Sequence, residues 1–229
     1  MSKSTFKRTW EEPVSDEEDA QVEKEFRFDP KRWERLTREE KKARMYDRKP
    51  SKQELLAAAG KTVPDVIAHG LQLLFCGINP GLYTAAVGHH FARPGNRFWP
   101  ALLKAGFTDR LLAPSEEREL LKRGYGITNL VARATASASE LSNEEYAQGA
   151  RILEKKILRY GPKCVAFLGV GAYRAAFGRP KAVIGRQDER LGGAVIWTLP
   201  NPSGLNANYQ LDDLARLFGE LREVVAGVE

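Results

Sequence analysis

Hydrophobic residues along the chain gather into short continuous runs that alternate with longer stretches of helical periodicity. The runs at 71–77 (LQLLFCG), 163–169 (KCVAFLG) and 194–200 (AVIWTLP) are strongly apolar and stop at Gly or Pro. Such runs are typical of strands buried on both faces of a sheet. A weaker strand is expected at 126–131. Because these strands alternate with helices, we expect an α/β fold: a three-layer α/β/α sandwich with a short, mainly parallel central sheet.

Two stretches predict amphipathic helices with clear ends. Residues 142–162 begin with Ser142 and Glu145, the pair that forms a capping box, and end at Gly161-Pro162. Residues 210–227 carry leucines at helical spacing on one face. Shorter helices are expected at 51–60, from Asn96 onward and at 173–177.

Residues 1–50 differ from the rest of the chain, because they are dense in both signs of charge and poor in aliphatic side chains. We interpret them as a peripheral or partly mobile extension, and residues 51–229 as the globular domain. Asp29 and Pro30 suit the N-cap and the first helical position, which predicts a charged helix at 30–46. Two interpretations stay open: the extension adds nonspecific affinity for DNA, or it is a solvated tail with no part in catalysis.

The charge balance is basic, with 36 Lys and Arg against 30 Asp and Glu, a net charge of +6 and a pI of about 9.3. This balance is compatible with a polyanionic partner such as nucleic acid. No apolar run reaches the roughly 18–20 residues of a membrane span, and the N-terminus lacks the apolar core of a secretory signal. We therefore expect no membrane partner and a cytoplasmic, nucleoid-associated location.

The few metal-ligating side chains argue against a metal site. Cys76 and Cys164 lie inside apolar runs and are expected to be buried small hydrophobes. Two cysteines cannot build a four-cysteine iron–sulfur cluster or a Cys-rich zinc site. The pair His89-His90 has one further histidine, His69, and no carboxylate at ligand spacing in its loop. We expect neither a metal nor a cofactor.

Two loops after predicted strands hold the candidate chemistry. In parallel sheets, ligands bind beyond the C-terminal ends of the strands. The loop GINPGLYTAAVGHHFARPGNRFW follows the first strand, and LPNPSGLNANY follows the last. If the two strands lie near each other, both loops face one crevice. Taken alone, Asn79 in GINPG is either a turn residue, since Asn-Pro commonly begins turns, or an amide aimed at a ligand.

The two loops and their order resemble the mismatch-specific uracil/thymine-DNA glycosylase family of the uracil-DNA glycosylase superfamily. The matching segments lie between Ser51 and Glu229 and are GKTVPD, GINPGL, GHHFARPGNRFW, GITNLV, GARILEKKI and NPSGLNA. The resemblance implies a monofunctional hydrolase that flips and excises uracil from G mispairs in double-stranded DNA and so starts base excision repair. Thymine and damaged pyrimidines are further candidate substrates. It also implies a monomer without a cofactor. A non-catalytic DNA- or nucleotide-binding module on the same fold is the alternative.

The resemblance assigns the base pocket and the attacking water to the first loop. Asn79 would position water, because a neutral amide orients water without being an effective general base. Phe91 would stack on the flipped base, and main-chain groups near Ile78 and Phe91 would read its edge. Gly77 and Tyr83 would add to the pocket wall. Core packing is the alternative role for Phe91.

The resemblance assigns DNA contacts mainly to the second loop. Leu205 would be a wedge that fills the place of the flipped base, with Gly204 and Asn206 beside it facing the orphaned partner base. An inward-packed Leu205 is the alternative. Contacts with phosphate or other DNA groups are expected at Ser203, Asn201, His90 and Gly81. For the pair His89-His90, pocket lining is the alternative. Neither motif contains a lysine that could form a Schiff base, which favours a monofunctional enzyme. Asp65 or Asp109 could assist catalysis, and this point stays open, because neither lies in the GINPGL or NPSGLNA motif.

Overall fold

The computed structural model describes residues 49–227. All but the last two residues of the predicted extension at 1–50, and the whole predicted helix at 30–46, lie outside the described residues. None of the helices between residues 49 and 227 has the length and apolar character needed to cross a membrane.

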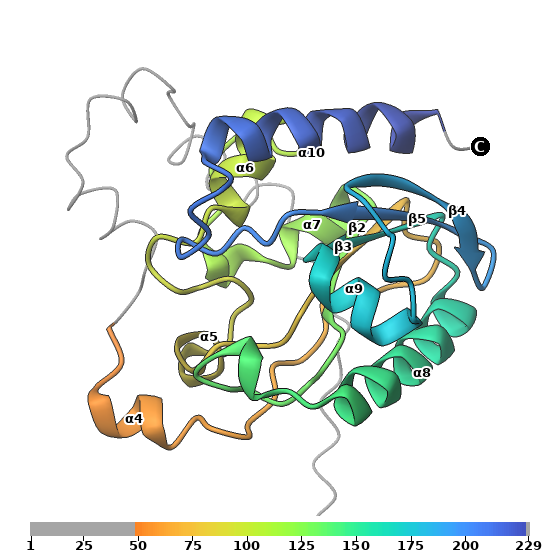
Figure 1. Ribbon diagram of the computed structural model, residues 1–229. Coiled ribbons are helices and arrows are strands. Elements are labelled where there is room, and N and C mark those ends of the chain that lie inside the picture. Colours follow the sequence, from red (N-terminus) through yellow and green to blue (C-terminus); the bar gives the residue numbers. More distant parts are fainter. Residues whose placement is uncertain (1–48, 228–229) are drawn as a thin grey trace, which may run out of the picture. The chain divides into compact units, whose positions relative to one another are not determined.

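A five-stranded sheet forms the centre of the described part, in the order β2-β1-β3-β5-β4 (Figure 1). Four of its strands, β2, β1, β3 and β5, are parallel, and β4 pairs with β5 in antiparallel fashion at the edge. Every residue of β1, β3 and β5 is buried, as expected for strands with both faces covered. The strands are β1 (Leu73–Gly77), β2 (Tyr125–Asn129), β3 (Cys164–Leu168), β4 (Gly185–Leu191) and β5 (Ala194–Leu199).

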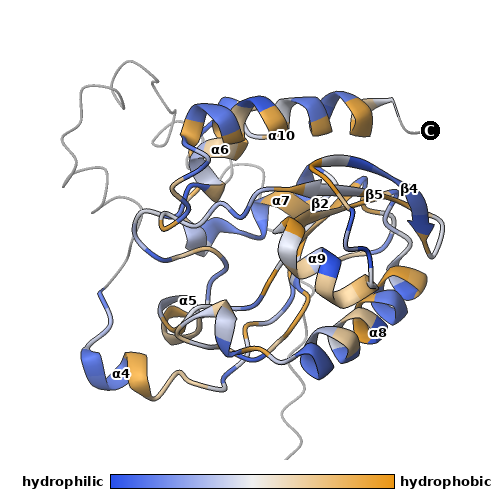
Figure 2. Cartoon of the chain, in the orientation of Figure 1, coloured by the Kyte–Doolittle hydropathy of each residue, from blue (hydrophilic) through white to orange (hydrophobic). Residues whose placement is uncertain are grey.

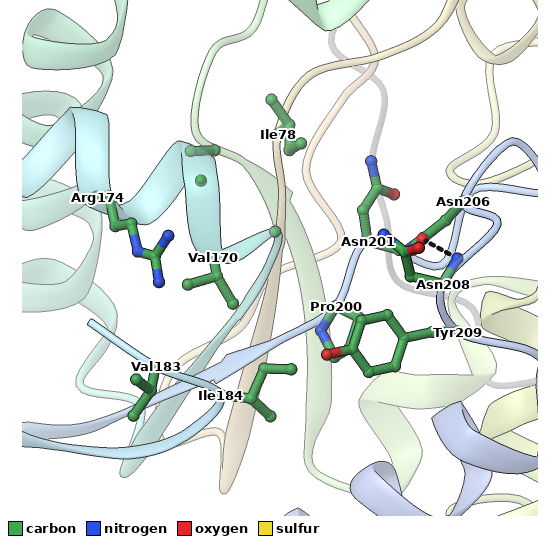
Figure 3. Close-up of a pocket in the computed structure, with 13 residues that line it drawn as sticks. Ile78, Val170, Arg174, Val183, Ile184, Pro200, Asn201, Asn206, Asn208 and Tyr209 are labelled. Atoms are coloured by element: carbon green, nitrogen blue, oxygen red, sulfur yellow. Dashed lines mark hydrogen bonds between the residues drawn. The ribbon is translucent and has the colours of Figure 1, made fainter. Parts of the chain in front are cut away.

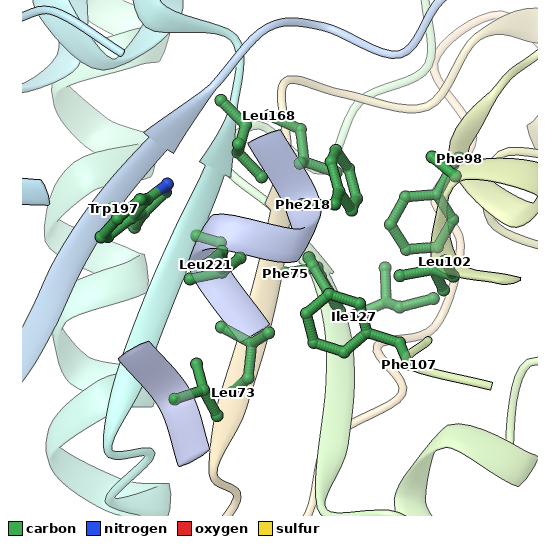
Figure 4. Close-up of a cluster of buried hydrophobic side chains, with 14 of the residues drawn as sticks. Leu73, Phe75, Phe98, Leu102, Phe107, Ile127, Leu168, Trp197, Phe218 and Leu221 are labelled. Atoms are coloured by element: carbon green, nitrogen blue, oxygen red, sulfur yellow. The ribbon is translucent and has the colours of Figure 1, made fainter. Parts of the chain in front are cut away.

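Side chains of β1 alternate between two cores, which makes the fold three-layered. Leu73 and Phe75 join a core with α6 (Phe98–Lys104) and α10 (Leu211–Ala226), drawn in Figure 4. Leu74 and Cys76 join a second core on the opposite face, with α8 (Asn143–Tyr160) and α9 (Val170–Phe177). Figure 2 shows the hydrophobic strands between helices of mixed hydropathy. The predicted α/β/α sandwich with a mainly parallel sheet is confirmed.

The long helix α8 begins and ends as its sequence predicts. Ser142 Oγ accepts a hydrogen bond from Glu145 N, and Glu145 Oε2 accepts one from Ser142 N, which completes the capping box. Gly161 ends the helix with a φ of +60°, a left-handed conformation that glycine adopts at low cost. Cys76 and Cys164 are free and buried, and burial raises the pKa of both thiols. The predicted ends of this helix and the predicted burial of the two cysteines are confirmed.

Several short elements differ from the expectation. The helix expected at 51–60 is the single turn α4 (Lys52–Leu56), and the first long loop contains a helix, α5 (Leu82–Val87). A further short helix, α7 (Glu119–Lys122), precedes β2. Strand β4 was not expected, because its sequence GRQDERL has no apolar run; it lies at the sheet edge and pairs with β5 alone.

Candidate active site

The turn GINPG follows directly from the C-terminal end of β1, at the centre of the sheet. There the Asn79 side chain is half-buried and firmly held. Its Nδ2 donates to the Arg133 carbonyl over 2.9 Å and to Thr135 Oγ1 over 2.7 Å, with a longer contact of 3.3 Å to the Pro80 carbonyl. Because a carbonyl oxygen only accepts, these contacts fix which end of the amide is nitrogen.

The fixed amide leaves its oxygen available. No described residue donates a hydrogen bond to Asn79 Oδ1. A half-buried acceptor of this kind can take a hydrogen bond from a water molecule and so orient the lone pairs of that water. The geometry of Asn79 therefore suits the alignment of a water, and its neutral amide does not remove the proton.

The segment that holds Asn79 is itself tied to the start of α8. Thr135 is buried, its Oγ1 donates to the Ser137 carbonyl over 2.8 Å, and its N–H donates to the Pro80 carbonyl. Arg133 makes two hydrogen bonds to Glu145, of 2.7 and 3.0 Å. The hydrogen bond from Arg133 lowers the pKa of the Glu145 carboxyl to about 2, so this pair stays ionised at neutral pH. The long-range partners of Asn79 thus rest on a capped helix.

Phe91 adopts a strained backbone conformation and forms an aromatic stack. Its φ of +54° places it in the left-handed region, where it is the sole non-glycine among the described residues. A bulky side chain there is uncommon, and such strain gathers at functional sites. The Phe91 ring stacks on Phe98, with centroids 4.1 Å apart, while Phe98 is fully buried. Phe91 is half-buried, so the core partner fixes the plane of a ring that is still partly accessible.

Gly77 lies where Phe91 and Asn129 meet. A Cβ atom at residue 77 would come within 2.5 Å of Asn129 Oδ1 and 3.3 Å of Phe91 Cζ. Only a residue without a side chain fits between them. Asn129 is the last residue of β2, next to β1 in the sheet, and is paired with Gly77 in register.

His90 orients the Asn129 amide from behind. The His90 ring is buried, and its Nε2 lies 3.0 Å from the Pro64 carbonyl, so Nε2 carries the proton. Its Nδ1 then accepts from Asn129 Nδ2 over 3.4 Å. Burial lowers the pKa of His90, which favours the neutral ring that this arrangement needs. Asn129 Oδ1 receives no hydrogen bond within residues 49–227 and faces the Gly77–Phe91 region.

A hollow of about 530 Å³ lies beside the GINPG turn. Its lining is drawn in Figure 3. Ile78 reaches its wall, and the first turn of α9 and the loop after β5 complete it. Gly169, the N-cap of α9, has a φ of +145°, and a Cβ there would lie 2.9 Å from Ile78 Cδ1. The hollow is lined by Ile78, Gly169, Val170, Gly171, Ala172, Arg174, Val183, Ile184, Pro200, Asn201, Asn206, Asn208 and Tyr209.

The loop after β5 presents one large apolar side chain to solvent. Leu205 is 75% exposed, so it does not pack inward. The loop around it is closed by internal hydrogen bonds: Asn201 Oδ1 accepts from Ser203 N over 3.0 Å, and Asn206 Nδ2 donates to the Asn201 carbonyl over 3.0 Å. Ser203 Oγ accepts from Leu205 N over 3.3 Å. An exposed leucine on an ordered loop is the geometry that a wedge between bases requires.

Comparison with known proteins decides the family. The sequence model of the uracil DNA glycosylase superfamily matches residues 64–222, which is more than half of the 229-residue chain. The chain belongs to the uracil DNA glycosylase superfamily. Membership supports DNA glycosylase activity in general, the hydrolytic release of a base from DNA. It is the coarser part of what the two loop motifs predicted.

A solved structure shares the fold of this superfamily member. The solution NMR structure of a candidate uracil DNA glycosylase from Methanosarcina acetivorans superposes with a TM-score of 0.51. The match covers 72% of this chain and 98% of the other chain, and the two sequences are 17% identical. At this identity the likeness shows the α/β fold alone.

The superfamily fold brings most of the predicted site residues to the loops that follow the C-terminal ends of β1 and β5. Asn79, Gly77 and Phe91 lie around the end of β1, while Ile78 connects Asn79 to the hollow. Other residues lie at the edges of this region. Tyr83 is half-buried on the first turn of α5, and Gly81 is the exposed N-cap of that helix.

His90 is the residue whose position departs most from the predicted role. Of its two expected roles, contact with DNA does not fit, because His90 is 1% exposed and both ring nitrogens have protein partners; in this structure it positions Asn129 instead. Asn201 likewise uses its side-chain oxygen within the loop. The two carboxylates whose assistance in catalysis was left open are both paired: Asp65 with Lys156, and Asp109 with Arg123. No group of three metal-ligating side chains occurs among the described residues.

Three residues of the site were missed in the sequence: Thr135, Asn129 and Arg97. Asn129 had a weak signal, because it is a polar residue within the strand expected at 126–131 and within the segment GITNLV. Its place at the end of β2, beside Gly77 of β1, is seen only in the structure. Thr135 had none, and Arg97 lies in the segment GHHFARPGNRFW without a signal of its role, since both roles depend on contacts with segments far along the chain.

Proposed function

We propose that this protein is a monofunctional DNA glycosylase that flips and excises uracil from G mispairs in double-stranded DNA. Thymine and damaged pyrimidines are further candidate substrates. The observation that carries the proposal is the Asn79 amide, whose nitrogen is held by Arg133 and Thr135 while its oxygen is left to a ligand. Superfamily membership supports the general reaction. The enzyme would act without a cofactor, as a monomer, on DNA in the cytoplasm.

The reaction breaks the bond between C1′ of the deoxyribose and N1 of the base. The electron pair of that bond leaves with the base, and the sugar develops oxocarbenium character. A water held by Asn79 Oδ1 adds its oxygen to C1′, and its surplus proton passes to solvent or to the departing base. Because an amide is not an effective general base, catalysis relies on departure of the base and on preorganised hydrogen-bond donors. Slow turnover that favours good leaving groups follows.

The base would lie between the Phe91 ring and the Asn129 amide. Stacking on an aromatic ring stabilises a flipped base by roughly 1–3 kcal/mol and tolerates different bases. Asn129 Oδ1 can accept the N3–H of uracil or thymine. The main-chain N–H groups of Ile78 and Phe91 have no hydrogen-bond partner among residues 49–227, so both are available to a pyrimidine carbonyl.

Mispair recognition would fall to the loop after β5. Leu205 would enter the stack as the base leaves it, and the backbone of residues 204–206 would face the orphaned guanine. A mispaired base costs less to flip than a paired one, which favours G·U over A·U pairs. The DNA strand would run along the hollow beside Ile78, where the α9 amides and Arg174 are exposed to it.

A duplex assay tests the proposal. The protein is incubated with labelled duplexes that contain G·U, A·U, G·T or G·C pairs, and the products are treated with alkali, which cleaves abasic sites. We expect scission at G·U after alkali and intact strands without alkali, since no lysine lies in either motif. Intact G·U strands after alkali would favour the non-catalytic DNA- or nucleotide-binding alternative, and scission without alkali would refute the monofunctional assignment.

A further inference from the structure

Arg97 binds the backbone of the loop that carries Leu205. Its Nη1 donates to the Asn206 carbonyl over 2.9 Å and to the Tyr209 carbonyl over 2.8 Å, with a longer contact of 3.3 Å to the Ser203 carbonyl. Its Nη2 lies 3.5 Å from the Gly204 carbonyl. One guanidinium thus collects the carbonyls on both sides of Leu205, which lie more than 100 positions away in the sequence.

Main-chain contacts place the same two segments together. Arg97 N donates to the Pro202 carbonyl over 2.9 Å. Gly204 approaches Gly95 so closely that a Cβ at residue 204 would lie 2.5 Å from the Gly95 oxygen. The turn at 95–97 and the loop at 202–206 are therefore docked backbone to backbone, and the Arg97 side chain closes the contact.

The partners of Arg97 connect the two halves of the candidate site. Arg97 is the N-cap of α6, and Phe98 next to it is the buried ring on which Phe91 stacks at 4.1 Å. On the other side lies Leu205, 75% exposed. The ring that would stack on a flipped base and the leucine that would replace it are thus held from neighbouring residues of one short helix.

We propose that Arg97 is a positioning residue that sets the loop of Leu205 in its DNA-inserting conformation before DNA binds. This inference rests on the proposed function, since it needs Leu205 to act as a wedge. A loop that is already ordered loses less conformational entropy on binding, so its affinity for a duplex with an empty base position is higher. Arg97 does not touch the DNA base or the reacting atoms in this role; it acts through the loop.

Lysine cannot replace Arg97 in this arrangement. The planar guanidinium spreads its donors over several carbonyls in fixed directions, whereas an ammonium is a point charge on a flexible stem. The substitution Arg97→Lys therefore keeps the charge and removes the set of hydrogen bonds to the loop carbonyls. Arg190→Lys is the matched control, because Arg190 also donates to a main-chain carbonyl, that of Gly193, but in the β4–β5 hairpin.

The test measures binding to a duplex with a tetrahydrofuran abasic analogue opposite guanine, beside an undamaged duplex of the same sequence. We expect Arg97→Lys and Leu205→Ala each to weaken binding to the abasic duplex by about tenfold. The double variant should bind it no more weakly than the weaker-binding single variant. Binding to undamaged duplex should change less than about twofold, and Arg190→Lys should match the wild type on both. Two side chains that act through one loop cannot add their effects.

Gly204→Ala disrupts the same contact from the other side and serves if Arg97→Lys does not fold. It should give the same loss of affinity for the abasic duplex and the same lack of additivity with Leu205→Ala. Losses that multiply in the double variant, or unchanged affinity of the single variants, would overturn the inference. A wild-type protein that prefers the abasic duplex but releases no uracil from G·U would refute the proposed function. The role of Arg97 in positioning the loop would still hold.

Discussion

Asn79 and Thr135 lie 56 positions apart, yet Nδ2 of the first donates to Oγ1 of the second over 2.7 Å. The contact decides what the asparagine can do, because it turns the amide so that Oδ1 is the end left for a ligand. If Oδ1 holds the attacking water, removal of the amide should slow chemistry and leave DNA binding intact. We expect Asn79→Ala to lower the single-turnover excision rate on G·U duplex by about a hundredfold.

Thr135→Val is the graded counterpart of that substitution. It keeps the shape of the side chain and removes one of the acceptors of the Asn79 nitrogen, together with the hydrogen bond to the Ser137 carbonyl, while the Arg133 carbonyl remains. We expect about a tenfold loss of rate, with unchanged affinity for abasic duplex. Saturating single-turnover kinetics measure the rate, and fluorescence anisotropy measures the affinity. An unchanged rate in Asn79→Ala would remove Asn79 from the mechanism.

Gly77→Ala should damage the base pocket from within. The new Cβ would lie 2.5 Å from Asn129 Oδ1, so Asn129 or Phe91 has to move. We expect a stability loss of about 1–3 kcal/mol from overpacking, together with at least about a tenfold fall in excision rate. Gly219→Ala, on α10 with open space around it, is the control and should keep full activity. Chemical denaturation and single-turnover kinetics measure the two effects; a variant that loses stability but keeps its rate would place Gly77 outside the pocket.

The sequence predicted the elements whose signals are local. Buried runs identified β1, β3 and β5, and the capping box of Ser142 and Glu145 identified the start of α8, because each signal lies within one element. Strand β4 escaped detection since an edge strand with half-exposed positions needs no apolar run; its place depends on β5 beside it. The same limit explains α5, a helix of six residues without a side-chain cap.

The candidate site divides in the same way. Residues whose place inside a motif carries their role, such as Asn79, Phe91 and Leu205, could be named from the sequence. Residues that support them could not, because Thr135 and Arg97 act through contacts with distant segments. The DNA contact expected of His90 does not fit for a related reason, because the distant residues Pro64 and Asn129 satisfy its ring in the interior.

Acid should destabilise the protein through His90. Burial lowers the pKa of His90 below its ordinary value of 6.5. Between the lowered native pKa and 6.5, the unfolded chain binds a proton that the native chain excludes, so the free energy of unfolding falls as the pH drops through this window. Above 6.5 the His90 contribution is fully present. Glu117, which accepts from His90 N, faces the same residue and opposes the shift without reversing it.

His90→Gln isolates this contribution, because its amide can donate to the Pro64 carbonyl and accept from Asn129 without titrating. Thermal unfolding at several pH values between about 5 and about 7.5 should show a steeper acid loss for the wild type than for the variant. Because the two proteins differ at residue 90 alone, every other contribution to the pH dependence cancels in the difference. Parallel curves for the two proteins would show that His90 is not excluded from protonation in the native state.

Leu205→Ala should separate folding from function most cleanly. Because the side chain is 75% exposed, its loss should change stability by less than about 0.5 kcal/mol. A wedge acts only where a helix has to be kept open, so excision from G·U duplex should fall by about tenfold while affinity for single-stranded DNA stays the same. Leu158→Ala on α8, where Leu158 is 66% exposed, is the matched control and should match the wild type in both assays. Equal losses on duplex and single strand would mean that Leu205 contributes general DNA affinity, and the wedge assignment would fail.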